Sequence, residues 1–237
     1  EKVDLVAAIA TPTAQAMVAQ ESDIPVVFIS VSNPVGAGII TDMAKPDKNA
    51  TGTSNAIPLS TIFELSDALT PGMETYGLLY CTSEVNSVTT VNTAKEYLDS
   101  KGLKYVEQVV TNSSEVQQAA QALVGEVDAI FVPNDSVIQA AMPQVAEVAR
   151  DNKIPVYGSS AVMVKSGCLA TVAITDTEIG AISADMAIQI LTGTPIEEVP
   201  AVVVPANAIV GSSTTAEILG VEVPEKLGDM EVQQIAD

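Results

Sequence analysis

Apolar and polar positions follow the same order, strand then helix then strand, in two stretches of the chain. The first stretch opens with Val3-Asp4-Leu5-Val6 and closes on Ile24-Pro25-Val26-Val27. The second opens with Val127-Asp128-Ala129-Ile130 and closes on Ile154-Pro155-Val156-Tyr157. Equivalent residues are 124 apart at the front and 130 apart at the back, so the second helix or its turns are about six residues longer. Two similar α/β lobes predict a cleft that holds a small ligand.

Short apolar runs alternate with segments of helical periodicity along the rest of the chain. This order predicts an α/β fold of two Rossmann-like lobes joined by a hinge, each with a parallel sheet covered on both faces. The predicted first lobe comprises residues 1–72 and 176–199, and the second comprises residues 73–175 and 200–237. The expected strands are 3–10, 25–30, 76–80, 104–110, 127–130, 154–157, 169–174 and 201–204. The expected helices are 13–21, 58–69, 87–101, 114–124, 177–191 and 213–219, with one longer helix after Ser136.

The second lobe contains a strand, helix, strand, helix segment over residues 76–124 that has no counterpart in the first lobe. By the internal repeat, about 50 residues belong upstream of Glu1. We therefore expect a fragment of a longer protein with an incomplete first lobe, and a processed mature terminus is the competing explanation. Unpaired strand edges in that lobe would attract a partner chain, which predicts a homo-oligomer or a swapped dimer.

Charge and cysteine content exclude some classes of binding partner and site. Thirty acidic and ten basic residues, with no histidine, give a net charge of −20, which repels nucleic acid and anionic membrane surfaces. No apolar run reaches the roughly 18 residues that span a bilayer. Most of the acidic residues are expected on a solvated surface, and Cys81 and Cys168 have no metal-ligand spacing, which leaves them either free or paired. We expect neither a metal nor a cofactor.

Enzyme signatures are scarce in this chain. The absence of histidine removes the commonest general base and any Ser/His or Cys/His nucleophile pair. The phosphate-binding, dinucleotide-binding, nucleophile-elbow and CxxC motifs are also missing. Binding without catalysis is therefore the preferred interpretation.

Ligands bind at the carboxyl ends of parallel strands, so the polar residues there form the candidate site. Thr11 and Thr13 begin a helix, where hydroxyl groups and free amides accept a carboxylate, although simple capping also explains them. Asp135 takes the position equivalent to Thr11, where it either pairs with an ammonium group or caps the helix that starts at Ser136. The two sides together suit a zwitterion. The strand-end candidates are Thr11, Thr13, Ser32, Asn33, Ser83, Glu84, Asn86, Ser87, Asn134, Asp135 and Ser159.

Several motifs resemble one family along essentially the whole chain. They are Val3 to Gln15, Ile24-Pro25-Val26-Val27-Phe28, Asn33-Pro34-Val35-Gly36-Ala37-Gly38, Thr51-Gly52-Thr53-Ser54, Ser83-Glu84-Val85-Asn86-Ser87, Val116-Gln117-Gln118-Ala119-Ala120, Val127 to Ile130 with Pro133-Asn134-Asp135, and Gly167 to Thr171. Together they resemble the substrate-binding proteins of ABC importers typified by tryptophan and tyrosine binders. That family has the fold of type I periplasmic binding proteins.

The resemblance implies an extracytoplasmic receptor, periplasmic or a cell-surface lipoprotein, that delivers an amino acid to ABC permease subunits and their ATPase. The implied ligand is an aromatic or otherwise hydrophobic L-amino acid, and which one is left open. One departure concerns the ligand's ammonium group. Where the family shows Ile-Asp-Tyr, this chain has Ile174-Thr175-Asp176, so the acid is displaced by one residue and the aromatic ring is lost. Asp176 joins the candidate set for that reason.

A second function hypothesis is a ligand-sensing domain of a regulator or receptor, because the same two-lobed architecture serves both roles. A DNA-binding segment upstream, or a transmembrane segment and kinase downstream, would favour sensing. A secretion signal that ends in a lipid-attachment cysteine would favour transport.

Overall fold

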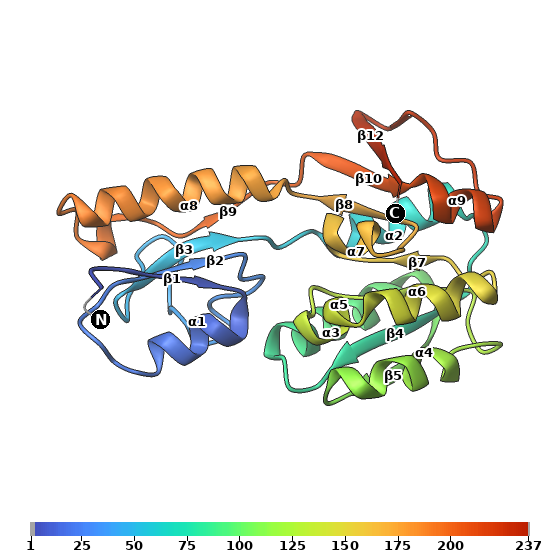
Figure 1. The fold of residues 1–237 in the computed structure, drawn as a ribbon, viewed down its shortest axis with the longest axis horizontal. Coiled ribbons are helices and arrows are strands. Elements are labelled where there is room, and N and C mark those ends of the chain that lie inside the picture. The colour runs from blue at the N-terminus through green and yellow to red at the C-terminus, as the bar shows by residue number, and fades with distance from the viewer. Residues whose placement is uncertain (1–2, 237) are drawn as a thin grey trace. The chain divides into compact units, whose positions relative to one another are not determined.

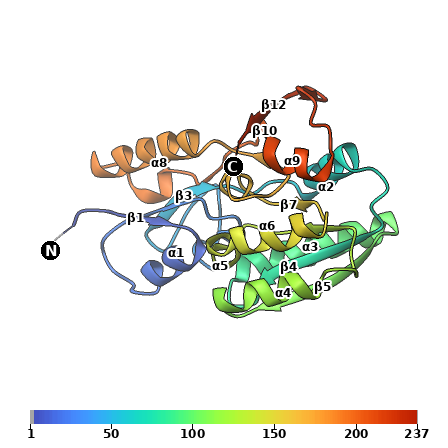
Figure 2. The same cartoon turned by 45° about the vertical axis from the view of Figure 1, so that its right-hand side comes forward.

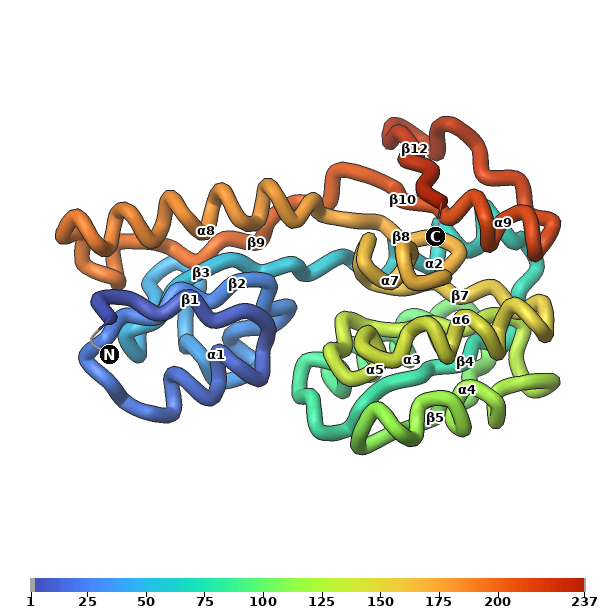
Figure 3. Tube along the Cα trace, in the orientation of Figure 1, coloured from blue at the N-terminus to red at the C-terminus, as the bar shows by residue number. Residues whose placement is uncertain are grey.

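The computed structural model describes residues 3–236 of the chain, which divide into two compact units. Unit 1 comprises residues 1–56 and 174–206, and unit 2 comprises residues 57–173 and 207–237. The chain passes from one unit to the other three times, as the tube in Figure 3 shows. No helix within residues 3–236 has the length and apolar character needed to cross a membrane.

Unit 1 is built on a four-stranded parallel sheet. The strand order is β1 (Val6–Ile9), β2 (Val26–Ile29), β3 (Ala50–Ser54) and β9 (Val202–Val203). Helix α1 (Thr11–Val18) covers one face of this sheet and α8 (Asp176–Leu191) covers the other, as Figure 1 shows. A short 3-10 turn, η2 (Ile196–Glu198), leads from α8 to β9. This arrangement is the expected parallel sheet covered on both faces.

The core of unit 1 lies between its sheet and the loop that follows β2. Phe28, Val31, Ile39 and Ile40 are buried there together with small residues of α1 and β3. Gly52 sits in β3 with a φ of +157°, and a side chain at this position would collide with the carbonyl oxygen of Phe28. The glycine therefore allows β2 and β3 to approach each other closely.

Unit 2 is built on an eight-stranded sheet whose order is β11, β12, β10, β8, β7, β6, β4, β5. The strands are β4 (Thr75–Cys81), β5 (Lys104–Val110), β6 (Ala129–Phe131), β7 (Val156–Tyr157), β8 (Ala170–Ala173), β10 (Ala208–Ser212), β11 (Lys226–Leu227) and β12 (Met230–Ile235). Strands β5, β4, β6, β7 and β8 pair in parallel in this order, and β10 joins β8 in the antiparallel sense. Strands β3, β10, β11 and β12 were not expected from the sequence.

Helices cover the sheet of unit 2, as Figure 2 shows from a second direction. They are α2 (Leu59–Leu69), α3 (Val85–Lys101), η1 (Ser113–Glu115), α4 (Val116–Ala122), α5 (Ser136–Ala140), α6 (Met142–Asp151), α7 (Ala161–Lys165) and α9 (Ser213–Leu219). Gly102 and Gly220 end α3 and α9 in the left-handed conformation. The side chain of Ser212 caps α9 by accepting the N–H of Thr215.

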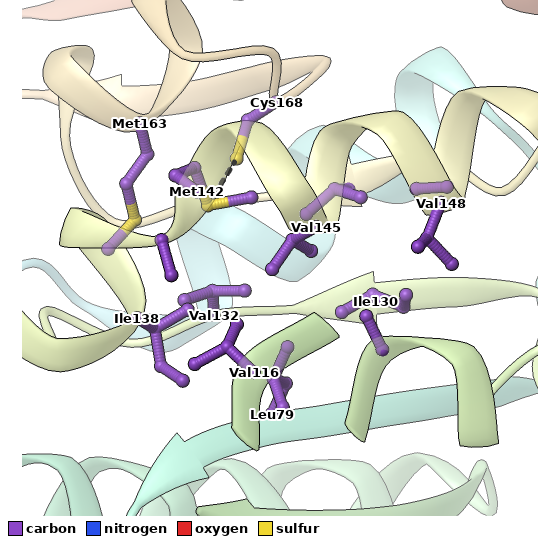
Figure 4. Close-up of a cluster of buried hydrophobic side chains, with 14 of the residues drawn as sticks. Leu79, Val116, Ile130, Val132, Ile138, Met142, Val145, Val148, Met163 and Cys168 are labelled. Carbon is purple, nitrogen blue, oxygen red and sulfur yellow. Dashed lines mark hydrogen bonds between the residues drawn. The ribbon is translucent and has the colours of Figure 1, made fainter. Parts of the chain in front are cut away.

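The main hydrophobic cluster of unit 2 lies between its helices and the central strands. Leu79 and Ile130 come from β4 and β6, Val132 directly follows β6, and Ile138, Met142 and Val145 come from α5 and α6 (Figure 4). Cys168 packs there with its Sγ atom 3.8 Å from the Sδ atom of Met142. Cys81 is also buried, and both cysteines are free, which answers the question of their pairing.

The two predicted copies of the repeat lie in separate sheets. Strands β1 and β2 pair in parallel in unit 1, and β6 and β7 pair in parallel in unit 2. The prediction of one longer helix in the second copy is wrong, because the helix breaks at Ala141 into α5 and α6. Pro143 is the second residue of α6 and lacks the N–H that would continue the hydrogen-bond ladder from α5.

The division into units differs from the expected lobe boundaries at three places. Helix α2, which was expected in the first lobe, belongs to unit 2, while residues 174–175 and 200–206, which were expected in the second lobe, belong to unit 1. The reason for the first difference is packing. Phe63 of α2 stacks on Tyr97 and meets Tyr76 edge-on, and Thr70 shares a 2.8 Å hydrogen bond with the hydroxyl of Tyr157.

Candidate ligand-binding site

Asp135 lies at the carboxyl end of β6 and begins α5. Its Oδ1 atom accepts hydrogen bonds from the N–H groups of Val137 (3.0 Å) and Ile138 (2.9 Å), and its Oδ2 atom accepts one from the N–H of Cys81 (2.7 Å). The side chain is 2% exposed. Asp135 is therefore the cap of α5 and also ties α5 to the end of β4, so the capping interpretation is confirmed.

Glu84 lies beside Asp135 as the residue that precedes α3. It is 5% exposed, and its Oε1 atom accepts a hydrogen bond from the N–H of Ser136 (3.0 Å). Burial raises the pKa of the Glu84 carboxyl group, and the negative charge of Asp135 raises it further. Two buried acids at the same sheet end create a region that favours a cation.

Asn86 and Ser87 complete this group in the first turn of α3. The Nδ2 group of Asn86 donates to the carbonyl oxygen of Asn134 (2.6 Å), and the hydroxyl of Ser87 donates to the same oxygen (3.3 Å). The bond from the Nδ2 group orients the Asn86 amide so that its Oδ1 atom does not face the Asn134 carbonyl. That oxygen is buried and accepts no hydrogen bond from the described residues. A buried acceptor without a donor is costly, and an incoming N–H group would remove that cost.

Two further serines lie at the same end of the sheet. Ser83 is exposed, and its hydroxyl lies 2.9 Å from the Sγ atom of Cys81. Ser159 is buried after β7, where its hydroxyl donates to the carbonyl oxygen of Val132 (2.9 Å). The structure thus brings together all seven candidates of unit 2 at the carboxyl ends of β4, β6 and β7.

The start of α1 in unit 1 has a different character. The residue before it, Ala10, has φ 68° and ψ 162°, and no side chain caps the helix. Thr11 is buried, while the hydroxyl of the exposed Thr13 turns back to donate to the carbonyl oxygens of Ala10 (2.9 Å) and Ile9. Pro12 has no N–H group, so the first-turn amides of Thr11 and Thr13 remain for an outside acceptor. The positive end of the helix dipole favours an anion there.

The remaining candidates of unit 1 are Ser32, Asn33 and Asp176. Ser32 donates its hydroxyl to the Oδ1 atom of Asn55 (3.0 Å), and Asn33 closes a turn by accepting the N–H of Gly36 (2.8 Å). Asp176 is exposed as the first residue of α8. Along the chain this helix follows β8, not β1 or β2. Asn55 was missed by the sequence analysis, although it directly follows the carboxyl end of β3 and the strand-end rule should have included it.

The chemistry available at these residues is that of recognition. Among residues 3–236 no three His, Cys, Asp or Glu side chains form a group that could hold a metal ion. The strand ends of unit 1 offer N–H and hydroxyl groups, whereas those of unit 2 offer acidic and amide oxygens.

Comparison with known proteins decides the family. The family profile described as "ABC transporter substrate binding protein" matches residues 1–234. The chain belongs to this family. It is 36% identical over 222 residues to the tyrosine-binding protein of Clostridioides difficile (strain R20291), and this alignment covers 94% of the chain. The alignment covers 64% of that relative, so the chain spans less than two thirds of the relative's length.

Two solved structures support the same assignment. An ABC domain from Streptococcus pneumoniae in complex with L-Trp superposes with a TM-score of 0.92 at 35% identity, over 98% of this chain and 79% of the other. A conserved domain protein from Vibrio cholerae O1 biovar El Tor superposes with a TM-score of 0.90 at 32% identity, over 94% of this chain and 76% of the other. The substrate-binding protein described here therefore has the expected fold of type I periplasmic binding proteins.

Proposed function

We propose that this protein binds an aromatic or otherwise hydrophobic L-amino acid for an ABC importer. The observation that carries the proposal is the contrast between the two sets of strand ends. The uncapped start of α1 presents free N–H groups, and the cluster of unit 2 presents two buried acids with a buried amide oxygen that lacks a donor. A zwitterion carries both complementary groups, a carboxylate for the N–H groups and an ammonium group for the oxygens.

The ligand carboxylate is assigned to the start of α1. The N–H groups of Thr11 and Thr13 would donate to it, and the helix dipole would add a favourable field. Ser32 and Asn33 follow the neighbouring strand β2 and would line the same side. The strained backbone of Ala10 supports this assignment, because such conformations concentrate at ligand sites.

The ligand ammonium group is assigned to Glu84 and Asn86. An ammonium group would donate to the Oδ1 atom of Asn86 and to a Glu84 oxygen, while the charge of Asp135 adds attraction. Asp135 would act mainly by its charge and by positioning the cluster, because its oxygens already accept three backbone N–H groups. Ser83, Ser87, Asn134 and Ser159 would shape the surroundings.

The ligand class is supported by the relatives, one named for tyrosine and one solved with L-Trp. The chain itself has three Phe, five Tyr and no Trp, which limits any aromatic enclosure of the side chain. The partners would be ABC permease subunits with their ATPase, and the protein would act outside the cytoplasm without catalysis. Neither a cofactor nor a metal is required for this role.

Titration calorimetry with matched analogues tests the proposal. L-Trp, L-Tyr, L-Phe and L-Leu are compared with tryptamine, which lacks the carboxylate, and with indole-3-propionate, which lacks the ammonium group. We expect binding of at least one L-amino acid and a loss of about 100-fold or more for each truncated analogue, because a buried charge pair is left without its partner. Equal affinity for tryptamine and L-Trp would refute the carboxylate site at α1.

A further inference from the structure

Strand β3 of unit 1 carries buried hydroxyl groups, and each of them is used inside the protein. Thr51 donates its hydroxyl to the carbonyl oxygen of Val199 (2.7 Å), the residue after η2. Thr53 shares a hydrogen bond of 2.9 Å with the hydroxyl of Ser183 on α8. A buried hydroxyl without a partner is costly, so these bonds fix the position of β3 in unit 1. The strand is therefore a rigid support for the residue that follows it.

Ser54, the last residue of β3, extends this support beyond the strand. Its side chain is 1% exposed and makes two hydrogen bonds. The hydroxyl donates to the carbonyl oxygen of Ser32 (3.1 Å), in the loop after β2, and accepts the N–H of Ala56 (3.2 Å). One buried side chain thus holds the backbone on both sides of Asn55.

The amide of Asn55 is oriented by a side chain of the neighbouring loop. The hydroxyl of Ser32 donates to its Oδ1 atom (3.0 Å), which directs the Nδ2 group away from Ser32. That Nδ2 group donates to no acceptor within residues 3–236. A serine hydroxyl has a single proton, and Ser32 has already used its own for Asn55. The available donor at this strand end is therefore the Nδ2 group of Asn55.

Asn55 lies on the same edge of the sheet as the start of α1. The strands β1, β2 and β3 are parallel and adjacent in this order, so the loop after β2 lies between the end of β1 and Asn55. Neighbouring strands are about 4.8 Å apart, which places β1 and β3 about 10 Å apart. A carboxylate in front of the end of β2 can accept hydrogen bonds from both sides, because each one spans about 2.9 Å.

We propose that Asn55 binds the ligand carboxylate through its Nδ2 group, and that Ser32 and Ser54 are positioning residues for it. The inference rests on the proposed function and extends the carboxylate site from α1 to the end of β3. An ammonium group has no acceptor, so within the amino-acid backbone the Nδ2 donor selects the carboxylate end. Ser32 would orient the amide and would not donate to the ligand itself.

Replacing the donor by an oxygen tests the contact. Asn55→Asp keeps the shape of the side chain and the acceptor for Ser32, but it opposes a carboxylate. Titration calorimetry compares whichever of L-Trp, L-Tyr, L-Phe and L-Leu binds best with the α-amide of the same amino acid. We expect a loss of about 30-fold or more for the amino acid and of less than about fivefold for the uncharged amide.

The matched control is Asn49→Asp, the same substitution directly before β3. It adds the same charge to unit 1 at the opposite end of the strand, where the Nδ2 group of Asn49 donates to the carbonyl oxygen of Ser22 (3.3 Å). Both probes should bind this variant within about twofold of the parent protein, because an exposed charge at that distance is screened.

A double-mutant cycle tests the positioning role of Ser32. Ser32→Ala leaves the Asn55 amide without its orienting donor and should weaken amino-acid binding by about fivefold. In the Asn55→Ala background the same substitution should change affinity by less than about twofold, because Ser32 acts only through that amide. Ser32→Thr retains the hydroxyl and should restore most of the affinity.

The outcomes separate this inference from the proposed function. A parent protein that binds none of the four amino acids would overturn both. Binding by the parent protein, with equal affinities of Asn55→Asp and Asn49→Asp, would overturn the inference alone. Equal losses for the amino acid and its amide would contradict the carboxylate contact. Additive losses from Ser32→Ala and Asn55→Ala would contradict the positioning role of Ser32.

Discussion

Helices α1 and α5 begin at equivalent points of the two units, yet their N-termini are satisfied in opposite ways. The start of α5 is closed by two acids, since Asp135 accepts the N–H groups of Val137 and Ile138 and Glu84 accepts that of Ser136. The start of α1 has no side-chain cap, and its first residues are Thr11 and Pro12. Side chains of the protein thus occupy the positive end of α5, whereas no side chain caps that of α1.

The two helix starts show that one repeated unit can favour opposite charges. Both copies supply a strand that is followed by polar residues and a helix N-terminus, and such a helix start favours an anion. Placing Glu84 and Asp135 in unit 2 fills the helix end and leaves a surplus of negative charge there. The start of α1 then favours an anion, whereas the residues around the start of α5 favour a cation, and the proposed function depends on this difference.

Removing Asp135 should have the largest effect on ligand affinity. Asp135→Ala leaves three backbone N–H groups without their acceptor and removes one negative charge from the proposed ammonium site. We expect amino-acid affinity to fall by about 30-fold or more in titration calorimetry, together with a lower Tm. Asp128→Ala is the control, because Asp128 holds the start of β4, and its affinity should stay within about twofold of the parent protein. Equal small losses for both variants would limit Asp135 to helix capping.

An acidic residue introduced at the start of α1 should remove the difference in charge between the two helix starts. Thr13→Asp places a carboxylate in the first turn of α1, where it stabilises the helix and repels the ligand carboxylate. Affinity should fall by about tenfold while the Tm is unchanged or raised. Ala16→Asp, one turn further along the exposed side of α1, is the matched control and should bind normally. If Thr13→Asp binds as well as Ala16→Asp, the carboxylate lies elsewhere.

Because the pKa of Glu84 is raised, both stability and ligand affinity should depend on pH. In the ligand-free protein Glu84 keeps its proton to a higher pH than in the unfolded chain, so its contribution to stability falls as pH rises from the ordinary value of 4.5 through the raised value. A bound ammonium group favours the ionised form, so affinity should rise by about threefold across the same window. Glu84→Gln should flatten this rise. A slope that persists in Glu84→Gln would assign the proton to another group.

The fold was predictable because its signals are local. The repeated Val-Asp and Ile-Pro segments mark β1, β2, β6 and β7, and the parallel pairing follows from the helices between them. The contents of the strand ends were also predictable, since parallel strands place Glu84 and Asp135 at one edge. Which atoms remain unsatisfied was not predictable. The free Oδ1 atom of Asn86 depends on the 2.6 Å bond from its Nδ2 group to Asn134, a contact between residues far apart in the sequence.

The limits of the two units and the lengths of some helices differ from the expected ones for a related reason. Phe63 and Thr70 place α2 in unit 2 through partners on α3, β4 and β7, and no residue within α2 signals that choice. The break at Ala141 had a local signal in Pro143, but proline is also tolerated in the first turn of a helix, as in α1. Local sequence fixes which elements form more firmly than which elements they join.

Substitution of Asp176 should have the smallest effect on ligand affinity. It stands one residue beyond the position where the family carries an acid, and it is exposed in the first turn of α8. An exposed carboxylate in that turn interacts with the helix dipole and is screened by solvent, so its contribution to ligand binding is small. Asp176→Asn should therefore change amino-acid affinity by less than about twofold in titration calorimetry. Thr175→Asp, which restores the family's acid at its usual position, should strengthen binding if that position contacts the ammonium group. A loss of tenfold or more in Asp176→Asn would show that the displaced acid binds the ammonium group itself, and the cation site could then no longer be assigned to Glu84 and Asn86 alone.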